Sequence, residues 1–300
     1  MIRIRTFAAG SVLLASLVAG AIADVPRPST ARYVSSPGGE RSAAPGYHVL
    51  AADFHVHSFP FSWSTLSPFE TVIDARHHGL DVVALTPHNH LWVAQVGEWF
   101  SRMVDGPLVI VGEEITHKGY HLIGVGLRET VSNELPASEA IVQIHRQGGV
   151  AIAAHPYRAF WPGFDAAALA ALDGTEVIRP DSLRNEAGRT ELQTFLARTD
   201  AAVIGATDYH GLGPVGVART YVFARERSVQ GVLDAIRDKR TVVYDEQRPY
   251  GDPTMMQLLE QTGGMPRDVP VSPLPGGLAL FSRAAALGML AAVLLFNRMT

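Results

Sequence analysis

The sequence contains no cysteine and only two lysines, Lys118 and Lys239. The absence of cysteine excludes disulfide bonds and thiolate-held zinc, so any bound metal must be held by histidine and carboxylate side chains. Charged residues make up only 18% of the chain, and the formal net charge is -4. This balance argues against nucleic acid as the main partner, because phosphate-backbone binders are usually strongly basic. The sequence also shows neither a nucleotide-binding P-loop nor the elbow of a nucleophilic serine.

Histidine, by contrast, is frequent, with 12 in 300 residues. Two of them, His55 and His57, stand two positions apart in the segment Asp53-Phe54-His55-Val56-His57-Ser58, at the end of an apolar run. Alternate residues of an extended chain point to the same side, so both imidazoles can reach one metal ion. Taken alone the pair is weak evidence, because two unrelated core or surface histidines would give the same pattern.

The two ends of the chain carry apolar segments that differ from its middle. We expect residues 1–23 to be a signal peptide, with arginines before an apolar stretch and a small-residue cleavage site, followed by a flexible leader at 24–46. Residues 251–277 are predicted to be a Gly/Pro-rich linker, and residues 278–296 a C-terminal transmembrane helix. These features predict export to the periplasm or to the outer face of the cytoplasmic membrane. The alternatives are an uncleaved N-terminal anchor and a C-terminal amphipathic helix.

The middle of the chain, residues 47–250, alternates β-rich runs with helical patterns. Such alternation predicts a parallel sheet, and this number of units predicts an α/β barrel. The predicted strands are Val49–Phe54, Asp81–Thr86, Pro107–Val111, His121–Val125, Val150–Ala154, Thr175–Ile178, Ala202–Gly205, Thr220–Phe223 and Thr241–Tyr244. The predicted helices are Pro68–His78, Leu91–Met103, Ser138–Arg146, Phe164–Leu172, Arg184–Ala197 and Ser228–Asp238.

Metal-ligating residue types recur beside these predicted strands. In a β/α barrel the C-terminal strand ends gather on one face, where active sites are built. Independent structural histidines would not choose strand ends so regularly, so we predict one shared metal site. The residues that follow a strand are His55 and His57, His88, Glu113 and Glu114, His155, and Asp208 and His210, while His121 opens a strand.

At this point the motifs resemble those of the PHP superfamily, named for polymerase and histidinol phosphatase. The similar pieces are DFHVHS at 53–58, TPHN at 86–89, GEEIT at 112–116, HLIGVG at 121–126, GGVAIAAHP at 148–156 and TDYH at 207–210. The resemblance implies a distorted (β/α)7 barrel that holds two divalent ions, or three, of zinc, manganese or iron. It also implies the hydrolysis of phosphate esters.

The resemblance further implies a role for each ligand. His55 and His57 would bind a first metal together with Asp208, and Glu114, chosen over Glu113 by the family spacing, would bridge to a second. The remaining ligands would be His121 and His155 at the second metal and His88 and His210 at a third position. Asp53 would orient a ligand imidazole.

Two departures from the family pattern concern the third position. Pro87 stands where the family usually has an Asp, and residues 59–64 offer no strong ligand where members often supply a His or Asp. Unless Asn89 or His90 substitutes, we expect the third metal to be weak or missing.

The chemistry expected of such a site is attack by a water that the metals activate. Asp208 or His210 is the nearest group to move a proton. Arg158 is predicted to bind an anionic substrate group, although an exposed arginine at the barrel rim would fit the sequence equally well. Further residues are only hints: Phe61, Trp63 and Trp161 as pocket lining, and Glu176, Arg179 and Asp181 at another strand end.

Several functions remain open on the sequence alone. The leading hypothesis is an exported phosphoesterase that acts on a small-molecule ester. A second keeps the site but cleaves carbamate or aryl esters, as in proteins that resemble carbaryl hydrolase, and the aromatic 59–64 segment favours it. An amidohydrolase is disfavoured, because neither Lys118 nor Lys239 follows a suitable strand to serve as a bridging ligand. A non-catalytic metal-binding module is the fourth hypothesis.

Overall fold

The structure, a computed structural model, describes residues 46–261, except residues 61, 63, 65, 158–160, 181–185, 212–214 and 246–247. The predicted signal peptide at 1–23 and the predicted helix at 278–296 therefore lie outside the described residues, as does nearly all of the predicted leader. No described helix has the length and apolar character needed to cross a membrane.

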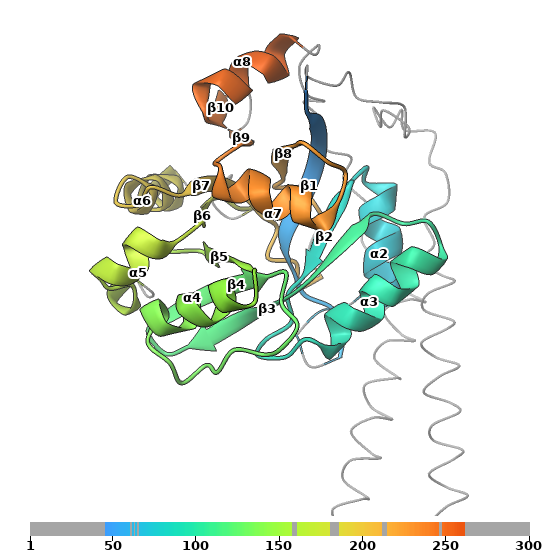
Figure 1. The fold of residues 1–300 in the computed structure, drawn as a ribbon, viewed down its shortest axis with the longest axis horizontal. Coiled ribbons are helices and arrows are strands. Elements are labelled where there is room, and N and C mark those ends of the chain that lie inside the picture. The colour runs from blue at the N-terminus through green and yellow to red at the C-terminus, as the bar shows by residue number, and fades with distance from the viewer. Residues whose placement is uncertain are drawn as a thin grey trace, which may run out of the picture. The chain divides into compact units, whose positions relative to one another are not determined.

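The described strands form one sheet with the order β10-β9-β8-β1-β2-β3-β4-β5-β6-β7 (Figure 1). Their bounds are β1 His48–Val56, β2 Val82–Leu85, β3 Leu108–His117, β4 Tyr120–Val125, β5 Val150–Ala153, β6 Gly174–Ile178, β7 Ala202–Gly205, β8 Thr220–Ala224, β9 Thr241–Asp245 and β10 Arg248–Gly251. The strands β1, β2, β3, β5, β6, β7 and β9 run in one direction. The prediction of a purely parallel sheet was wrong, because β4, β8 and β10 run antiparallel to their neighbours.

The sheet curves until its two ends approach one another, since β7 lies against β8 and β9. The Thr220 hydroxyl on β8 fastens this closure: it accepts a hydrogen bond from the Gly205 N–H at 2.9 Å and donates one to the Gly205 carbonyl at 2.9 Å. A Cβ on Gly205 would lie 2.7 Å from the carbonyl oxygen of Arg219, so only glycine fits this approach. The result is a nearly closed barrel, and it confirms the predicted PHP-type α/β barrel.

Helices connect most of the strands. Their bounds are α2 Pro68–His77, α3 Trp92–Met103, α4 Ala137–Arg146, α5 Ala166–Ala171, α6 Glu186–Leu196, α7 Val229–Arg237 and α8 Pro253–Gln261, with a short 3-10 helix, η1, at Trp161–Gly163. The first six match predicted helices within a few residues. Helix α8 falls where we predicted a linker from residue 251, and it buries Met255 and Leu259, so the folded domain extends beyond the predicted boundary at 250.

Local sequence explains where α2 begins. Ser67 and Glu70 form a capping box: the Ser67 hydroxyl accepts from the Glu70 N–H, and the Glu70 carboxylate accepts from the Ser67 N–H at 2.7 Å. Two of the N–H groups that a helix start leaves without partners are thus satisfied. Pro68 at the first helical position needs no N–H partner and fixes the backbone angle of the turn.

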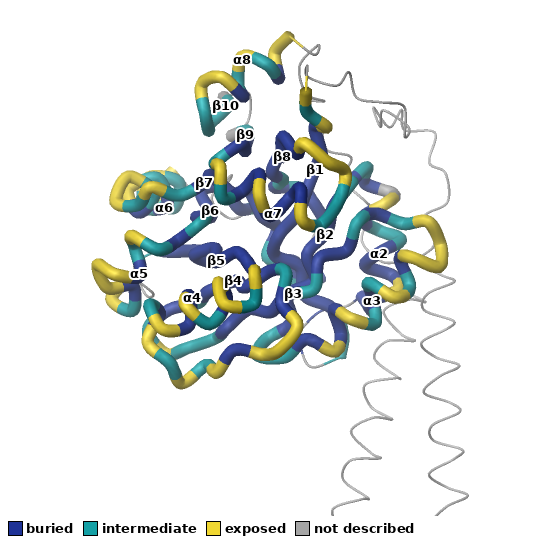
Figure 2. Tube along the Cα trace, viewed as in Figure 1, coloured by how far each residue is buried: buried dark blue, intermediate teal, exposed yellow. Residues whose placement is uncertain are grey.

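The barrel interior is an apolar cluster fed by alternate residues of the strands. On β1 its members are Leu50, Ala52 and Phe54, whereas Val49 and Ala51 pack on the outer face. Helix α7, which crosses the strands in Figure 1, adds Val232 and Ile236 to the interior cluster. Figure 2 shows the strands buried and the outward sides of the helices exposed. The metal-ligand residues must therefore lie at an end of this core rather than within it.

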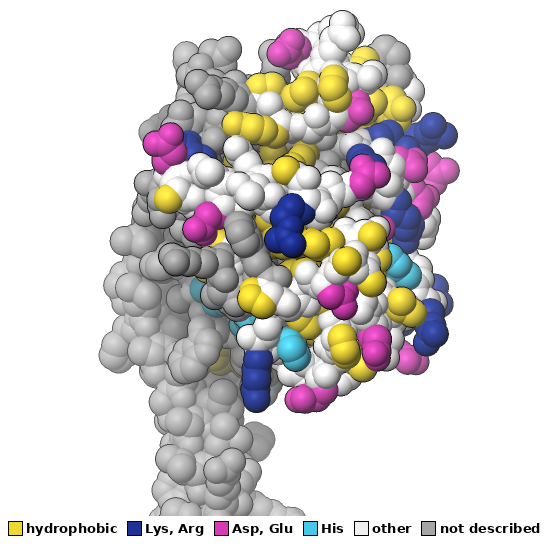
Figure 3. Space-filling model, turned by 90° about the vertical axis from the view of Figure 1, so that its left-hand side faces the viewer, with side chains coloured by type: hydrophobic (Ala, Val, Ile, Leu, Met, Phe, Trp, Pro, Cys, Tyr) yellow, Lys and Arg dark blue, Asp and Glu magenta, His cyan; other side chains and the backbone are white. Residues whose placement is uncertain are grey.

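On the face shown in Figure 3, acidic and basic side chains are interspersed. Among the described residues visible there, neither sign of charge forms one continuous patch.

Candidate metal centre

The eight predicted ligands lie together. Four overlapping groups of side chains each have their ligand atoms within 4.8 Å of one another. The groups are His55/His57/Glu114, His55/His155/Asp208, Glu114/His121/His155 and His57/His88/His210. All the residues that the sequence predicted as metal ligands appear in these groups. The separate ions to which we assigned them remain a prediction.

A break in the pleat of β1 aims its two histidines inward. The pairing of β1 with β2 shifts register between Asp53 and Val56. Up to Phe54 the even-numbered side chains face the barrel interior, but Val56 packs in the outer cluster. The irregularity reverses the alternation, so His55 and His57 turn to the interior side. Their Nε2 atoms lie 3.0 Å apart.

Strand reversal brings His121 to the same edge. His121 is the second residue of β4, which runs antiparallel to β3 and β5. Its start therefore lies beside the C-terminal ends of the other strands, and His121 Nδ1 approaches Glu114 Oε1 at 2.7 Å. Glu114 itself lies within β3 rather than after it, as we had predicted, because that strand continues to His117.

Glu114, His121 and His155, together with His55 and Asp208, form what we call the acidic half of the centre. Glu114 is only 1% exposed, and its Oε1 lies 3.0 Å from His155 Nε2 while its Oε2 lies 3.3 Å from His57 Nε2. Burial alone would raise the pKa of Glu114, but His55, His121 and His155 hold it well below its ordinary value. Glu114 is thus an ionised carboxylate at the middle of the cluster.

Asp208 completes the acidic half. Its Oδ1 lies 3.2 Å from His55 Nε2 and 3.3 Å from His57 Nε2, and its Oδ2 lies 2.5 Å from Arg179 Nη2. Burial works to raise the pKa of Asp208, but His55, His57 and Arg179 outweigh it and lower the pKa well below normal. Arg179, which the sequence gave only as a hint, therefore fixes the oxygen that points away from the histidines.

His57, His88 and His210 form the imidazole half. The rings of His57 and His210 have centroids 4.1 Å apart, and those of His57 and His88 4.4 Å apart. His88 and His210 are more open to solvent than Glu114 or His155, with side chains 27% and 34% exposed. Despite the missing family Asp at Pro87, the His88 ring is held, because its Nδ1 lies 2.8 Å from Glu114 Oε2 and 3.0 Å from the Thr116 hydroxyl.

Three non-glycine residues at the centre have left-handed backbones: Asn89 (φ 54°), His155 (φ 30°) and Asp208 (φ 50°). Each such residue costs of order 1–3 kcal/mol and persists only where its surroundings enforce it. Two of them are ligands, and the third follows the ligand His88. The Asn89 side chain is itself engaged, since its Oδ1 accepts from the Thr116 N–H at 2.9 Å.

Asp53 does not orient an imidazole, so that prediction was wrong. Its carboxylate accepts the backbone N–H groups of His55, Thr207 and Gly216 and the Thr207 hydroxyl. Burial raises the pKa of Asp53 to about 6, although these hydrogen bonds oppose the rise. Asp53 instead ties β1 to the segment that carries Asp208.

Glu176 takes the place that we had predicted for Asp53. It lies on β6 with no exposed surface, and its Oε1 is 2.7 Å from His55 Nδ1. In the sequence it was only a hint, because a lone glutamate inside a strand-like run carries no ligand spacing. An unusual acidic residue in an otherwise buried strand was the signal that could have found it.

The other predicted residues fall outside this geometry. His90 places its Nδ1 2.7 Å from the His88 carbonyl oxygen and stacks on Trp92, and neither it nor Asn89 appears in the ligand groups of the described residues. Arg158, the predicted anion-binding residue, lies outside the described residues, as do Phe61, Trp63 and Asp181. The side chain of Trp161 is not described.

The donor set fits divalent cations. The Oδ1 atom of Asp208 is buried and accepts no hydrogen bond from the described residues, although two imidazole nitrogens lie close to it. Neutral imidazole nitrogens and carboxylate oxygens that converge without protons between them repel one another unless a cation lies among them. With no cysteine in the chain, such nitrogen and oxygen donors suit zinc, manganese or iron.

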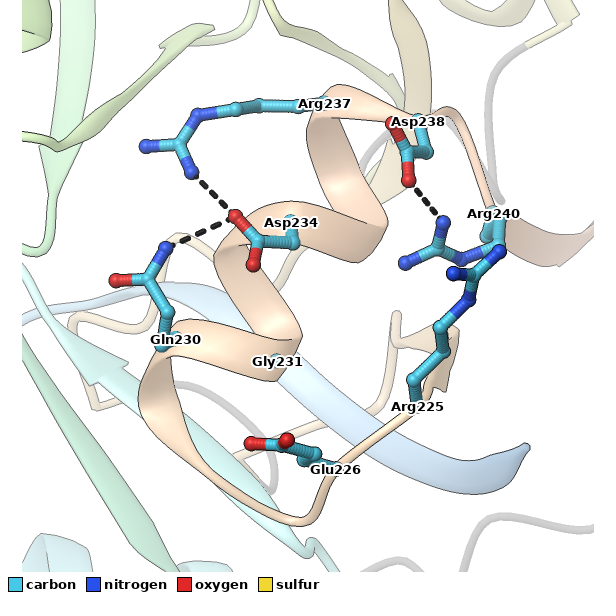
Figure 4. Close-up of a pocket in the computed structure, with 8 residues that line it drawn as sticks. All are labelled: Arg225, Glu226, Gln230, Gly231, Asp234, Arg237, Asp238 and Arg240. Carbon is cyan, nitrogen blue, oxygen red and sulfur yellow. Dashed lines mark hydrogen bonds and ion pairs between the residues drawn. The ribbon is translucent and has the colours of Figure 1, made fainter. Parts of the chain in front are cut away.

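A cavity of about 440 Å³ lies elsewhere, beside α7 (Figure 4). Its charged residues pair with one another: Asp234 binds Gln230 and Arg237, and Asp238 binds Arg240. It belongs to the opposite end of the strands, because Ala224, next to the lining residue Arg225, pairs with the first residue of β1. It shares no residue with the metal centre.

Comparison with solved structures defines the class of this fold. A two-domain protein from Bacteroides vulgatus, described as containing a predicted PHP-like metal-dependent phosphoesterase, is 23% identical to the chain. The match has a TM-score of 0.55 and covers 72% of this chain and 71% of that protein. A metal-dependent phosphoesterase from Bifidobacterium adolescentis, described as putative, is 20% identical, with a TM-score of 0.42 over 53% of this chain and 87% of that protein. By its fold, the chain is a member of the PHP superfamily.

A sequence relative narrows the placement. An uncharacterized protein of Methanocaldococcus jannaschii is 31% identical over 118 residues, which are 36% of this chain and 68% of the archaeal protein. The chain and this archaeal protein belong to the same family. No family model matches the chain.

Proposed function

We propose that the protein is a metal-dependent hydrolase that cleaves phosphomonoesters or phosphodiesters. The observation that carries the proposal is the convergence of eight ligand side chains into four overlapping groups, two of which share Glu114. The similarity in fold to the Bacteroides vulgatus protein, described as containing a phosphoesterase of this kind, supports the same conclusion. The ions we propose are two divalent cations in the acidic half, with a weaker third position at the imidazole half.

The chemistry follows from what the ions and the side chains each supply. When bound, divalent ions lower the pKa of water toward neutrality and neutralise charge on the substrate oxygens. Glu114 and Asp208 balance the charge of the cations, while Arg179 holds the outer oxygen of Asp208. Because both Asp208 oxygens are engaged, His210 is the better of the two predicted proton-transfer residues. Its Nδ1 donates to the Asp208 carbonyl oxygen at 2.9 Å, so its Nε2 can accept a proton.

A panel of esters tests this function. We expect purified protein loaded with manganese or zinc to hydrolyse p-nitrophenyl phosphate or bis-p-nitrophenyl phosphate, and to lose this activity after treatment with a chelator. The His57→Ala variant should be inactive, whereas His145→Ala should keep full activity. His145 is the matched control because its imidazole pairs with Asp173 on the outside of the domain.

The other outcomes separate the competing functions. Turnover of 1-naphthyl methylcarbamate without turnover of either phosphate would replace the proposal with a carbamate or aryl ester hydrolase. Stoichiometric metal binding without turnover of any ester would support a non-catalytic metal-binding module instead.

We further propose that the protein is exported, because residues 1–23 have the arginine-rich start, apolar stretch and Ala21-Ile22-Ala23 site of a signal peptide. Mass spectrometry of protein isolated from cell fractions tests this. The expected result is a mature chain that begins at Asp24 in the periplasmic or membrane fraction, and a full-length chain in the cytoplasm would contradict it.

A further inference from the structure

Glu176 is a buried carboxylate that touches two metal-ligand residues without belonging to any of the ligand groups. Its Oε1 lies 2.7 Å from the imidazole Nδ1 of His55, and its Oε2 accepts the backbone N–H of His155 at 2.6 Å. The two contacted residues stand on β1 and just after β5, and Glu176 on β6 spans them. One side chain therefore reaches a ligand predicted for the first metal and a ligand predicted for the second.

The contact with His55 determines which of its ring nitrogens can face a metal. An ionised carboxylate only accepts hydrogen bonds, so the proton between the two groups must sit on Nδ1 of His55. The Nε2 atom of a neutral His55 then carries a lone pair, and it points at Asp208 and His57. By contrast, Nδ1 of His57 has no hydrogen-bond partner among the described residues. The two histidines of the first motif are thus held differently.

The contact with His155 fixes a turn in an unusual conformation. His155 has a φ of 30°, a region that side chains other than glycine seldom occupy. Its N–H is bound by Glu176, and its Nε2 lies 3.0 Å from Glu114 Oε1. The same carboxylate that orients the His55 ring thus holds the backbone from which the His155 ring projects.

We propose that Glu176 is a positioning residue that sets the tautomer of His55 and the turn at His155, so that both imidazoles present lone pairs to the metal ions. The inference rests on the metal binding of the proposed function, and it does not depend on which ester is cleaved. Carboxylates that hold ligating histidines in this way typically contribute 10–100-fold to metal affinity.

Glu176→Gln gives a sharp test, because the amide has one donating end and one accepting end. The backbone N–H of His155 can only donate, so the amide oxygen must face it. The amide NH2 then faces His55 Nδ1 and donates to it. This forces the neutral His55 ring into the tautomer with its proton on Nε2, the nitrogen that should bind metal.

Glu113→Gln is the matched control. Glu113 is also a fully buried glutamate, and its Oε1 also accepts a backbone N–H at 2.6 Å, but that N–H belongs to Val131 rather than to a ligand. Any effect that comes only from losing a buried carboxylate should appear in both variants. Thermal unfolding of the metal-free proteins measures that common effect.

Two readouts on the full chain decide the matter. The first is affinity for Mn²⁺ or Zn²⁺ in competition with a chromogenic chelator, where Glu176→Gln should bind 10–100-fold more weakly than wild type and Glu113→Gln should match wild type. The second is the ¹⁵N NMR spectrum of the His55 ring in metal-free protein, at a pH where the ring is neutral. Wild type should carry the ring proton on Nδ1, and Glu176→Gln should carry it on Nε2.

Wild-type affinity in Glu176→Gln, or His55 protonated on Nε2 in the wild type, would overturn the inference. The wild-type spectrum decides it even if Glu176→Gln fails to fold, and Glu176→Ala, which imposes no tautomer, offers a second variant with an expected loss of affinity. If wild type itself binds no metal, it is the proposed function that fails, so the two failures are distinguishable.

Discussion

The two halves of the metal centre differ in charge and in burial. The acidic half contains two ionised carboxylates, Glu114 and Asp208, and is almost closed to solvent, whereas the imidazole half offers three neutral rings, two of which are more than a quarter exposed. A divalent cation in the acidic half has its charge balanced by the protein. A cation in the imidazole half gains no comparable balance, apart from the contact of His88 with Glu114. We therefore expect tight binding in the first and weak binding in the second.

The largest expected effect comes from Glu114→Gln, which removes the carboxylate that both halves touch. Metal content should fall by at least one ion per chain, and kcat/KM should drop by about 1000-fold or more, roughly 4 kcal/mol of transition-state stabilisation. Elemental analysis after gel filtration and steady-state kinetics measure the two effects. Unchanged metal content in this variant would show that Glu114 is not a ligand and would remove the basis of the comparison.

A pair of alanine variants compares the halves directly. His155→Ala, in the acidic half, should weaken metal binding on the order of 100-fold, about 2.8 kcal/mol, while His210→Ala, in the imidazole half, should weaken only the weakest binding step. Isothermal titration of the metal-free proteins with Mn²⁺ resolves the steps. If His210→Ala lost the tightest step, the two halves would have to be exchanged.

Removal of metal by a chelator should occur in stages. At low chelator concentration the ion of the imidazole half should leave first, because its ligands carry no charge and are open to solvent. The metal-to-protein ratio should therefore fall in two separate steps, which elemental analysis along the titration records. A single cooperative loss of all ions would mean that the halves do not differ in affinity.

The smallest effect is expected far from the centre, at Glu70, and it gives the baseline for stability alone. Burial raises the pKa of Glu70, with Asp74 acting in the same direction and the Ser67 hydrogen bonds against it. The folded protein thus binds its proton more tightly than the unfolded chain, and stability falls as the pH rises from the unfolded pKa through the raised folded pKa. Glu70→Gln, which can keep the capping box, should lack this fall.

Unfolding in denaturant at several pH values measures the baseline. The stability of Glu70→Gln relative to wild type should increase with pH across that window and then level off, with a total change below about 1 kcal/mol. Its metal affinity should equal that of wild type. A changed metal affinity would mean that stability and metal binding are coupled throughout the domain, and the variants at the centre would then need reinterpretation.

The sequence predicted the ligands well because each stands at a strand end with a recognisable neighbour. His55, His155 and Asp208 all follow apolar runs, and a barrel brings such positions to one face. His121 also belonged to the predicted set, but the reason for its position, the reversal of β4, depends on hydrogen-bond pairing that local sequence does not encode.

The parts that the sequence did not predict depend on contacts between distant segments. The exchange of roles between Asp53 and Glu176 is an example, because both are acidic residues in buried strands and only the register between strands decides which one reaches the His55 ring. Helix α8 was missed for a different reason. Its short segment lies beside Gly- and Pro-rich sequence, and burial of Met255 and Leu259 against the barrel supports it.

Anomalous X-ray diffraction from crystals of the full chain grown with Mn²⁺ or Zn²⁺, recorded at the absorption edge of the metal, tests the central claim most directly. The account predicts a strong peak between Nε2 of His55, Nε2 of His57 and Oδ1 of Asp208, and a second beside Glu114, His121 and His155. A folded protein with full metal content and no peak at either position would contradict it.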